Sequence, residues 1–312
     1  MTDPARRRSR NRMLALTLAA MGIVVSLIAL LSVELHRSYR RELDGAGAVA
    51  GALARTLEQQ LLASMDRIDL LEQEAAFQYA AHRQGTGLAG GQMNGLLARH
   101  LARVPGLLSL RLINERGDYV FDASGAVSPA NIADRRYFRV QQESAEAGLF
   151  PEGPLFSRVV SQWTLTFSRG VRGSDGRFLG IVQSSVQTDA LAVAFQSVSL
   201  GSGDNITLLN GDGALVARHP NLPELIGKPA ISDTLRGLLA SKVAEAVYSG
   251  RSAADGSLRV YALRRIGGYP FYVLVGIGQD RVLAEWRRTA AVYVLVAVVL
   301  LLGSIWLAVR AV

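Results

Sequence analysis

Two long apolar segments, one near each end of the chain, constrain this sequence more than any other feature. The first reads MLALTLAAMGIVVSLIALLSVEL over residues 13–35 and carries a single charge, Glu34; the second reads AAVYVLVAVVLLLGSIWLAV over residues 290–309 and carries none. Each has about the twenty residues that an α-helix needs to cross the hydrocarbon core of a bilayer. Backbone amides find no water there, so such segments have to be helical. The sequence therefore predicts transmembrane helices over residues 13–35 and 289–310.

Arginines before the first segment predict the orientation of the chain. Residues 1–12 contain five arginines and one acid, Asp3. By the positive-inside rule these residues form a cytoplasmic basic tail facing anionic headgroups, and residues 36–288 lie outside. A cleaved signal peptide is the alternative for the first segment. Its apolar run is longer than a typical signal-peptide core, and no A-x-A site leads into a disordered junction, so an uncleaved anchor is favoured.

Composition and residue spacing argue against several classes of function. Of the formal net charge of +8, residues 1–12 supply +4 (five Arg, one Asp), and the remainder is scattered. No basic stripe interleaved with aromatic residues is present, so nucleic-acid binding is not expected. The chain has no cysteine, which rules out disulfides and thiol chemistry. The four histidines have no metal-ligand spacing and no serine lies in G-x-S-x-G. We therefore expect no catalytic residue, no metal and no cofactor.

A helical pattern continues from the first apolar segment over residues 36–84. Apolar residues recur every three or four positions, as on one face of a long amphipathic helix: Val49, Leu53, Leu57, Leu61, Met65, Ile68, Leu71 and Ala75. This stalk helix could pack on its own domain, or it could pair with a second copy of the chain. We expect both, and hence a homodimer.

Beyond residue 84 the pattern is that of two α+β modules in tandem. LRLINERGDYVF, from residue 110, has the same strand–turn–strand pattern as ITLLNGDGALVA, from residue 206. RFLGIVQ and YPFYVLV repeat at a similar offset of about 95 residues, which indicates internal duplication. The modules are placed at residues 85–200 and 201–288, each an antiparallel sheet flanked by helices. Expected helices cover residues 93–103, 189–199 and 232–246; expected strands cover 108–113, 118–121, 154–171, 178–186, 258–264 and 271–276, with another near 247.

Four motifs carry a resemblance to a known family. They are NIADRRYFR (131–139), WTLTFSR (163–169), GRFLGIV (176–182) and DGALVARHP (212–220). In this order and spacing the region from about 42 to 281 resembles the double Cache (PAS-like) sensor domain, most closely those upstream of GGDEF-type diguanylate cyclases and sensor histidine kinases. The resemblance implies a bacterial inner-membrane protein with two periplasmic Cache modules behind a long helix. It also implies a small-molecule pocket in the membrane-distal first module and dimeric signalling to a cytoplasmic output domain, which we expect outside these 312 residues.

The strongest candidates for ligand contacts lie between Asp134 and Arg139. We expect Asp134 to cap a short helix, with Arg135, Phe138 and Arg139 on one face and Tyr137 on a neighbouring face. Guanidinium groups bind carboxylates bidentately, and a phenol adds a directional hydrogen bond. The ligand expected is an organic acid or an amino acid. In the alternative interpretation, Asp134 and one arginine form a structural ion pair while the two aromatic residues fill the core.

Further candidates lie on the strand over residues 163–169 and just after the next strand. Alternation places Trp163 and Arg169 on one face and Ser168 on the other, and the resemblance implies that this strand forms part of the pocket floor. All three are candidate ligand contacts, although Trp163 could equally be core. Asp189 lies where the resemblance implies an acid that holds an ammonium group, and its alternative role is that of a helix cap.

These observations favour the extracytoplasmic ligand-sensing region of a transmembrane receptor, without enzymatic activity of its own. Ligand binding would shift the population between two dimer arrangements and so move the second membrane helices. A ligand-free module for dimerisation or protein interaction, regulating a membrane-bound output domain, is the alternative. An extracytoplasmic enzyme would need a catalytic constellation that the sequence does not contain.

Overall fold

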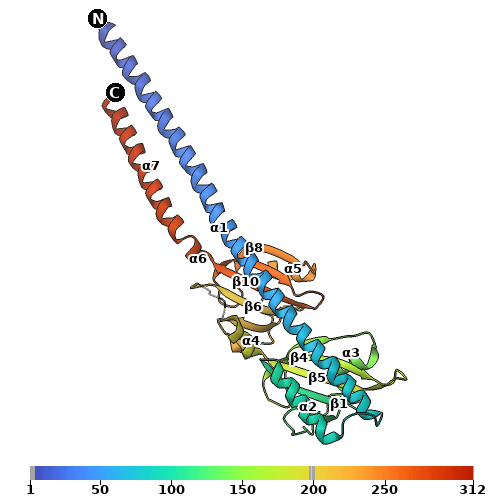
Figure 1. The fold of residues 1–312 in the computed structure, drawn as a ribbon. Coiled ribbons are helices and arrows are strands. Elements are labelled where there is room, and N and C mark those ends of the chain that lie inside the picture. Colours follow the sequence, from blue (N-terminus) through green and yellow to red (C-terminus); the bar gives the residue numbers. More distant parts are fainter. Residues whose placement is uncertain (1–3, 197, 199–200, 312) are drawn as a thin grey trace. The chain divides into compact units, whose positions relative to one another are not determined.

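The computed structural model describes residues 4–196, 198 and 201–311 (Figure 1). The side chains of residues 4–17, 307, 308, 310 and 311 are outside this description, so the prediction for the N-terminal arginines is not addressed by it. The chain divides into two units, one formed by residues 1–48 with 278–312 and the other by residues 49–277.

The first unit is helical and has an exposed apolar surface. It contains the start of α1 (Pro4–Arg83), the short α6 (Gln279–Val282), and α7 (Ala284–Ala311). Both α1 and α7 are long and apolar enough to cross a membrane, with mean hydropathies of 2.4 and 2.3 in windows that are 0% and 6% buried. The Ser26 and Ser32 hydroxyls donate to the carbonyls four residues earlier, which satisfies these polar groups within an apolar helix.

Contacts near the ends of the apolar segments hold the first unit together. The Trp286 ring packs edge-on against Tyr39 with centroids 5.1 Å apart, and Trp286 Nε1 donates to the Leu35 carbonyl at 3.2 Å. Tryptophan and tyrosine with one polar and one apolar end are typical of membrane–water interfaces. The predicted helix and stalk form one uninterrupted helix of 80 residues, and the glycines at 45, 47 and 51 do not break it.

The second unit contains two five-stranded antiparallel sheets with the same strand order. The first sheet has the order β2-β1-β5-β4-β3 and the second β7-β6-β10-β9-β8. The first is built from β1 (Leu107–Asn114), β2 (Tyr119–Asp122), β3 (Phe150–Phe156), β4 (Trp163–Arg172) and β5 (Phe178–Gln187). The second is built from β6 (Asn205–Asn210), β7 (Leu215–His219), β8 (Glu245–Arg251), β9 (Leu258–Arg265) and β10 (Phe271–Gly278). The predicted α+β fold with two tandem modules is confirmed.

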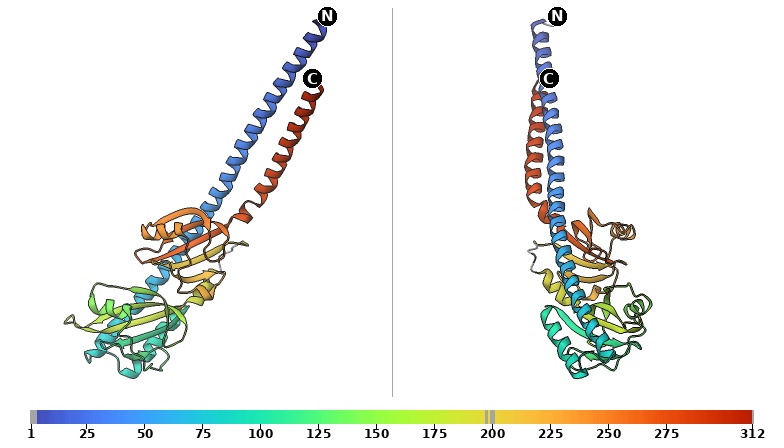
Figure 2. Two further views of the ribbon diagram at one scale, coloured as in Figure 1. Left: turned by 180° about the vertical axis from the view of Figure 1, so that it is seen from behind. Right: turned by 45° about the vertical axis from the view of Figure 1, so that its right-hand side comes forward.

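Helices flank both sheets. In the first module these are α2 (Gly90–Arg103) and α3 (Arg136–Glu143), and the second contains the 3₁₀ turn η1 (Pro223–Leu225) and α5 (Asp233–Ala240). The helix α4 (Thr188–Phe195) contacts β4 and β5 of the first sheet and β7 of the second. The segment of α1 within this unit runs along both modules (Figure 2). Arg169 and Ser184 of the first sheet bond to Asp69 and Glu72 of α1, and Arg264 of the second bonds to Glu58.

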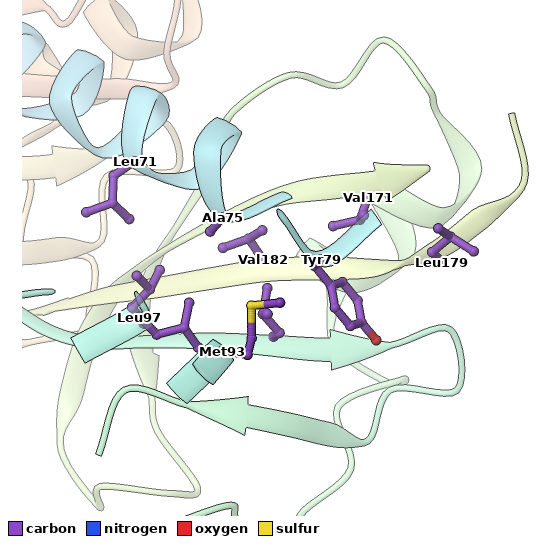
Figure 3. Close-up of a cluster of buried hydrophobic side chains, with 10 residues drawn as sticks. Leu71, Ala75, Tyr79, Met93, Leu97, Val171, Leu179 and Val182 are labelled. Atoms are coloured by element: carbon purple, nitrogen blue, oxygen red, sulfur yellow. The ribbon is translucent and has the colours of Figure 1, made fainter. Parts of the chain in front are cut away.

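The core of the first module fixes which face of its sheet remains free for a site. Leu71, Ala75 and Tyr79 of α1 and Met93 and Leu97 of α2 pack onto one face (Figure 3). Their strand partners are alternate residues, such as Leu110, Leu112 and Val182, because successive side chains on a strand point to opposite faces. The opposite face carries α3 and the loops around it, with Ile113, Tyr137 and Phe138 in a second core cluster.

Some helix ends differ from the predictions. Arg135, not Asp134, occupies the N-cap position of α3, while the Asp134 carboxylate accepts from Arg158 at 2.6 and 2.9 Å. Asp189 lies inside the first turn of α4 rather than at its cap, and the predicted end of that helix near Ser199 lies outside the described residues. The helix predicted over residues 232–246 ends at Ala240. Lys242 adopts φ +52° just beyond it, a left-handed conformation that commonly ends helices.

Candidate functional site

A hollow opens on the face of the first sheet that α1 and α2 leave free. It contains about 360 Å³ of non-atom space, part of it open to solvent. Strands β1, β2, β4 and β5 form its floor, and its walls come from the loop before α3, the start of α3, the end of β3 and the loop after β3. The lining residues are Arg111, Tyr119, Ile132, Arg135, Tyr137, Leu155, Phe156, Ser157, Arg158, Thr164, Thr166, Gln183 and Ser185.

The floor is polar because strand alternation brings one set of residues to this face. Thr164 and Thr166 come from β4 and Gln183 and Ser185 from β5, whereas their neighbours in sequence point toward α1. Arg111 of β1 is buried here, and its Nε donates to the Asp122 carboxylate at 2.5 Å. That pair neutralises the charge of Arg111, so Arg111 orders the floor rather than offering a free cation.

Arg135 offers the hollow an uncompensated positive charge. Its Nη2 donates to the Phe156 carbonyl at 3.3 Å, and among the described residues it forms no ion pair. The neighbouring Arg158 differs, because the Asp134 carboxylate binds it through both oxygens. No acidic residue is among those that line the hollow. A guanidinium without a carboxylate partner, beside neutral hydrogen-bonding groups, is an anion-binding arrangement.

Two tyrosines and a glutamine add directional hydrogen-bonding groups. Tyr119 and Tyr137 are both buried, and burial raises the pKa of each phenol above its ordinary value, so both stay protonated. Gln183 Nε2 donates to the Ser184 carbonyl, whereas its Oε1 is buried and has no hydrogen-bond partner in the described part of the chain. An unsatisfied buried acceptor costs free energy, so Gln183 Oε1 is an acceptor at this floor whose hydrogen-bonding capacity the described residues leave unused.

The structure places only two of the eight sequence-predicted ligand residues, Arg135 and Tyr137, in the lining of this hollow. Phe138 is buried in the core cluster beneath α3, edge-on to Phe178. Arg139 is exposed, and its Nη2 donates to the Asp134 carbonyl at 2.6 Å. Ser168 is fully buried, with its hydroxyl donating to the Tyr137 carbonyl at 3.2 Å.

The other three predicted residues lie away from the hollow. Arg169 points to the opposite face of the sheet, where its guanidinium pairs with Asp69 of α1. Trp163 packs against the core cluster of the second module and borders the backbone of Gly227. Asp189 accepts a long hydrogen bond, 3.4 Å, from Asn221 after β7. Trp163 and Asp189 therefore lie at the junction between the two modules.

Reasoning from the sequence did not single out Arg111, Arg158 or Gln183 as site residues. Alternation in β4 had separated the face of Ser168 from that of Trp163, and the Ser168 face, which also carries Thr164 and Thr166, is the one that lines the hollow. Arg158 lies in a loop without periodicity, so no local pattern connects it to Asp134, 24 residues earlier. Gln183 lies in β5, where the adjacent residues are small or apolar. A glutamine within such a strand was the one feature of the sequence that could have indicated a site residue.

Two tandem PAS-like modules behind a long helix, with a hollow on the open sheet face of the first, define an α+β sensor-type fold. The Cache domain family model matches residues 36–286, and the chain belongs to this family. The resemblance to the double Cache domain drawn from the four motifs is confirmed. A comparison with curated proteins finds no significant match.

Solved structures share the fold at low sequence identity. The extracellular domain of a histidine kinase, rpHK1S-Z16, has a TM-score of 0.68 at 23% identity, over 78% of this chain and 99% of that one. The ligand-binding domain of the Pseudomonas fluorescens chemoreceptor CtaA, solved with L-isoleucine, has a TM-score of 0.60 at 15% identity, over 80% and 98%. That of the Campylobacter jejuni chemoreceptor Tlp3, solved with 4-methylisoleucine, has a TM-score of 0.56 at 14% identity, over 78% and 93%.

Proposed function

We propose that this chain is the sensory region of a bacterial inner-membrane receptor and that the hollow of its first module binds a small carboxylate-bearing ligand, either an organic acid or an amino acid. The observation that carries the proposal is Arg135, which lines the hollow and forms no ion pair among the described residues. A ligand carboxylate would supply the missing partner through charge-assisted hydrogen bonds.

An amino acid can bond to more of the polar groups in the hollow than a simple acid can. Its carboxylate would bind Arg135, and its ammonium group would donate to Gln183 Oε1, the buried acceptor without a partner. In this arrangement Gln183 takes the role that the sequence had offered to Asp189. The amino acids and amino-acid-like ligands in the CtaA and Tlp3 structures support this choice of class.

The proposed receptor spans the membrane with α1 and α7, and its modules face the periplasm. An exposed apolar stripe on α1 supports a homodimer: Val49, Leu70 and Phe77 are 54%, 66% and 68% exposed. Their separations of 21 and 7 residues are multiples of the heptad, so they lie on one helix face as in paired helices. We further propose that ligand binding biases this dimer and signals through α7 to a cytoplasmic output of the histidine kinase or diguanylate cyclase type.

Ligand-induced stabilisation of the full chain in detergent micelles tests the first-module site. A library of amino acids and organic acids is screened by thermal unfolding, and a ligand at 100 times its Kd stabilises the folded state by about 2.7 kcal/mol. We expect Arg135→Ala to remove the shift produced by any hit. Arg139→Ala is the matched control, because Arg139 lies one helical turn away and does not line the hollow. The proposal is wrong if no carboxylate or amino acid stabilises the chain, or if both variants behave alike.

A further inference from the structure

The second module has a hollow of its own, in the position that matches the hollow of the first. It contains about 330 Å³ of non-atom space, part of it open to solvent. Residues from β6, β7, β9 and β10 line it, and these strands hold the places in the second sheet that β1, β2, β4 and β5 hold in the first. The duplication of the fold thus includes the cavity.

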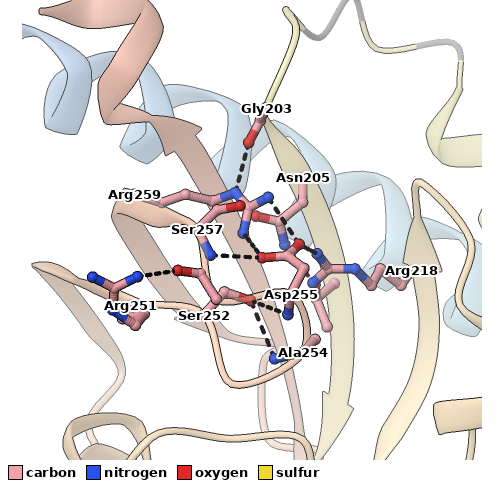
Figure 4. A network of polar contacts seen from close by, with 11 residues as sticks. Gly203, Asn205, Arg218, Arg251, Ser252, Ala254, Asp255, Ser257 and Arg259 are labelled. Atoms are coloured by element: carbon pink, nitrogen blue, oxygen red, sulfur yellow. Dashed lines mark hydrogen bonds and ion pairs between the residues drawn. The ribbon is translucent and has the colours of Figure 1, made fainter.

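A buried group with net positive charge lies at this second hollow. Arg218 of β7 lines it and Arg259 of β9 lies beside it, and the two residues are 5% and 4% exposed. Both guanidiniums bind one carboxylate, that of Asp255, at 2.7 Å from Arg218 and at 2.7 and 2.9 Å from Arg259 (Figure 4). Two cations share a single anion, so one positive charge remains uncompensated within this group.

The guanidinium of Arg218 is buried, so its positive charge is desolvated, and one of its N–H groups has no hydrogen-bond partner among the described residues. Burial lowers the pKa of its guanidinium, with Asp255 acting in the opposite direction and Arg259 in the same one. Its Nη1 donates to Thr207 at 3.3 Å and its Nη2 to Asp255, but its Nε is buried without a hydrogen-bond partner in the described part of the chain. Buried charged donors are normally satisfied, so the described residues leave the hydrogen-bonding capacity of the Arg218 guanidinium incomplete at a residue that lines the hollow.

The remaining walls fit a small organic anion better than an inorganic ion. Arg251 also lines the hollow and is exposed, which adds a further cation toward solvent. Tyr248 and Tyr261 line the hollow with stacked rings, 5.2 Å between centroids. Stacked rings present apolar surface that can pack against the hydrocarbon part of a ligand.

We propose that the second module is a second ligand-binding site, one that takes a small organic carboxylate on Arg218 and Arg251 with its carbon skeleton against the two tyrosines. The site is separate from the one in the first module and does not depend on it. A receptor with two such hollows would respond to two ligands, or to two concentrations of one ligand.

Site-resolved hydrogen exchange on the full chain in detergent micelles tests this proposal, with acetate, L-lactate and succinate as probes and chloride at equal ionic strength as the reference. We expect at least one probe to slow amide exchange in residues 248–259, where β8, the Asp255 turn and β9 meet. Protection in this segment reports the second hollow, whereas protection in residues 152–166 reports the first. The proposal is overturned if no probe protects residues 248–259.

Three variants connect the protection to the residues named. Arg218→Lys keeps the positive charge near Asp255 but removes the guanidinium, and we expect it to weaken binding at residues 248–259 by about tenfold or more. Ala253→Trp places an indole in the lining of the hollow without altering either buried arginine, and we expect it to block binding there. This variant tests the second site even if Arg218→Lys does not fold. Arg135→Ala alters only the first hollow and should leave this protection unchanged. Protection that survives in both second-module variants, or that disappears in Arg135→Ala, contradicts a separate second site.

Discussion

A carboxyl group buried between α1 and the first sheet makes the stability of this protein depend on pH. Glu72 lies on α1 and its side chain is fully buried. The Ser184 hydroxyl donates to its Oε1 at 2.7 Å, but its Oε2 has no partner among the described residues. Burial raises the pKa of this carboxyl to about 8, against the lowering effects of the Ser184 hydrogen bond and of Arg169. At neutral pH the folded protein therefore holds Glu72 in its protonated form.

The size of the effect follows from the difference in pKa between the folded and unfolded states. In the unfolded chain the pKa is 4.5, so unfolding near neutral pH releases a proton. The contribution of Glu72 to stability is then greatest below pH 4.5, and it falls by about 1.4 kcal/mol per pH unit as the pH rises toward 8. Over the whole interval the loss is about 5 kcal/mol, a large share of the 5–15 kcal/mol typical of folded domains.

Glu72→Gln tests this reasoning, because glutamine has the shape of the protonated carboxyl and cannot ionise. We expect the variant and the parent chain to differ by about 1 kcal/mol or less at pH 5, and the variant to be more stable by about 5 kcal/mol at pH 9. Urea unfolding of the full chain in detergent micelles across this pH range measures the difference. Glu74→Gln, an exposed position on the same helix, is the control and should not alter the slope. A constant difference between Glu72→Gln and the parent across the pH range would refute a raised pKa at Glu72.

Three further predictions concern the first sheet, its pairing with α1 and the proposed dimer. Arg169→Ala breaks the partly buried pair with Asp69, so it should lower the free energy of unfolding by about 1–3 kcal/mol while the affinity for a first-module ligand stays unchanged in titrations. Gly180→Ala should prevent folding as judged by circular dichroism, because Gly180 has φ +131° and an added Cβ would lie 1.9 Å from the Ile113 carbonyl oxygen. Phe77→Glu places a charge on the exposed stripe of α1 and should shift the chain from dimer toward monomer in analytical ultracentrifugation, with unchanged circular dichroism.

The architecture could be predicted because its determinants are local. Apolar residues at helical spacing specify α1, and alternating residues joined by turns specify strands such as β1 and β2. The repeated pattern near residues 110 and 206 predicted two modules, and both sheets have the same strand order. The end of α5 was missed, since its pattern continues past Ala240 and the left-handed conformation of Lys242 is not visible in the identity of a lysine.

The site could be predicted only in part because its geometry depends on pairings distant in sequence. Alternation correctly separated Thr164 and Thr166 from Arg169, but it does not tell which face of the sheet a helix covers. Asp69 of α1, 100 residues from Arg169, decides that question by pairing with it. Arg135 could be proposed as a ligand contact from its local motif. The pairing of its neighbour Asp134 with Arg158 could not be foreseen, because the two residues are distant in sequence.

The position of Trp163 at the module junction connects the first hollow to the second core. Phe156 lines the hollow, and its ring lies edge-on to Trp163 with centroids 5.6 Å apart. Trp163 in turn packs against the second module, where a side chain at Gly227 would come within 2.8 Å of its ring. Close-packed interiors transmit displacement because they lack free volume to absorb it. Phe156 itself is 51% exposed, so only the Trp163 end of these contacts lies against a packed core. A ligand that displaces Phe156 would act through this one ring contact on the core that contains β10, the strand that continues along the chain into α6 and α7.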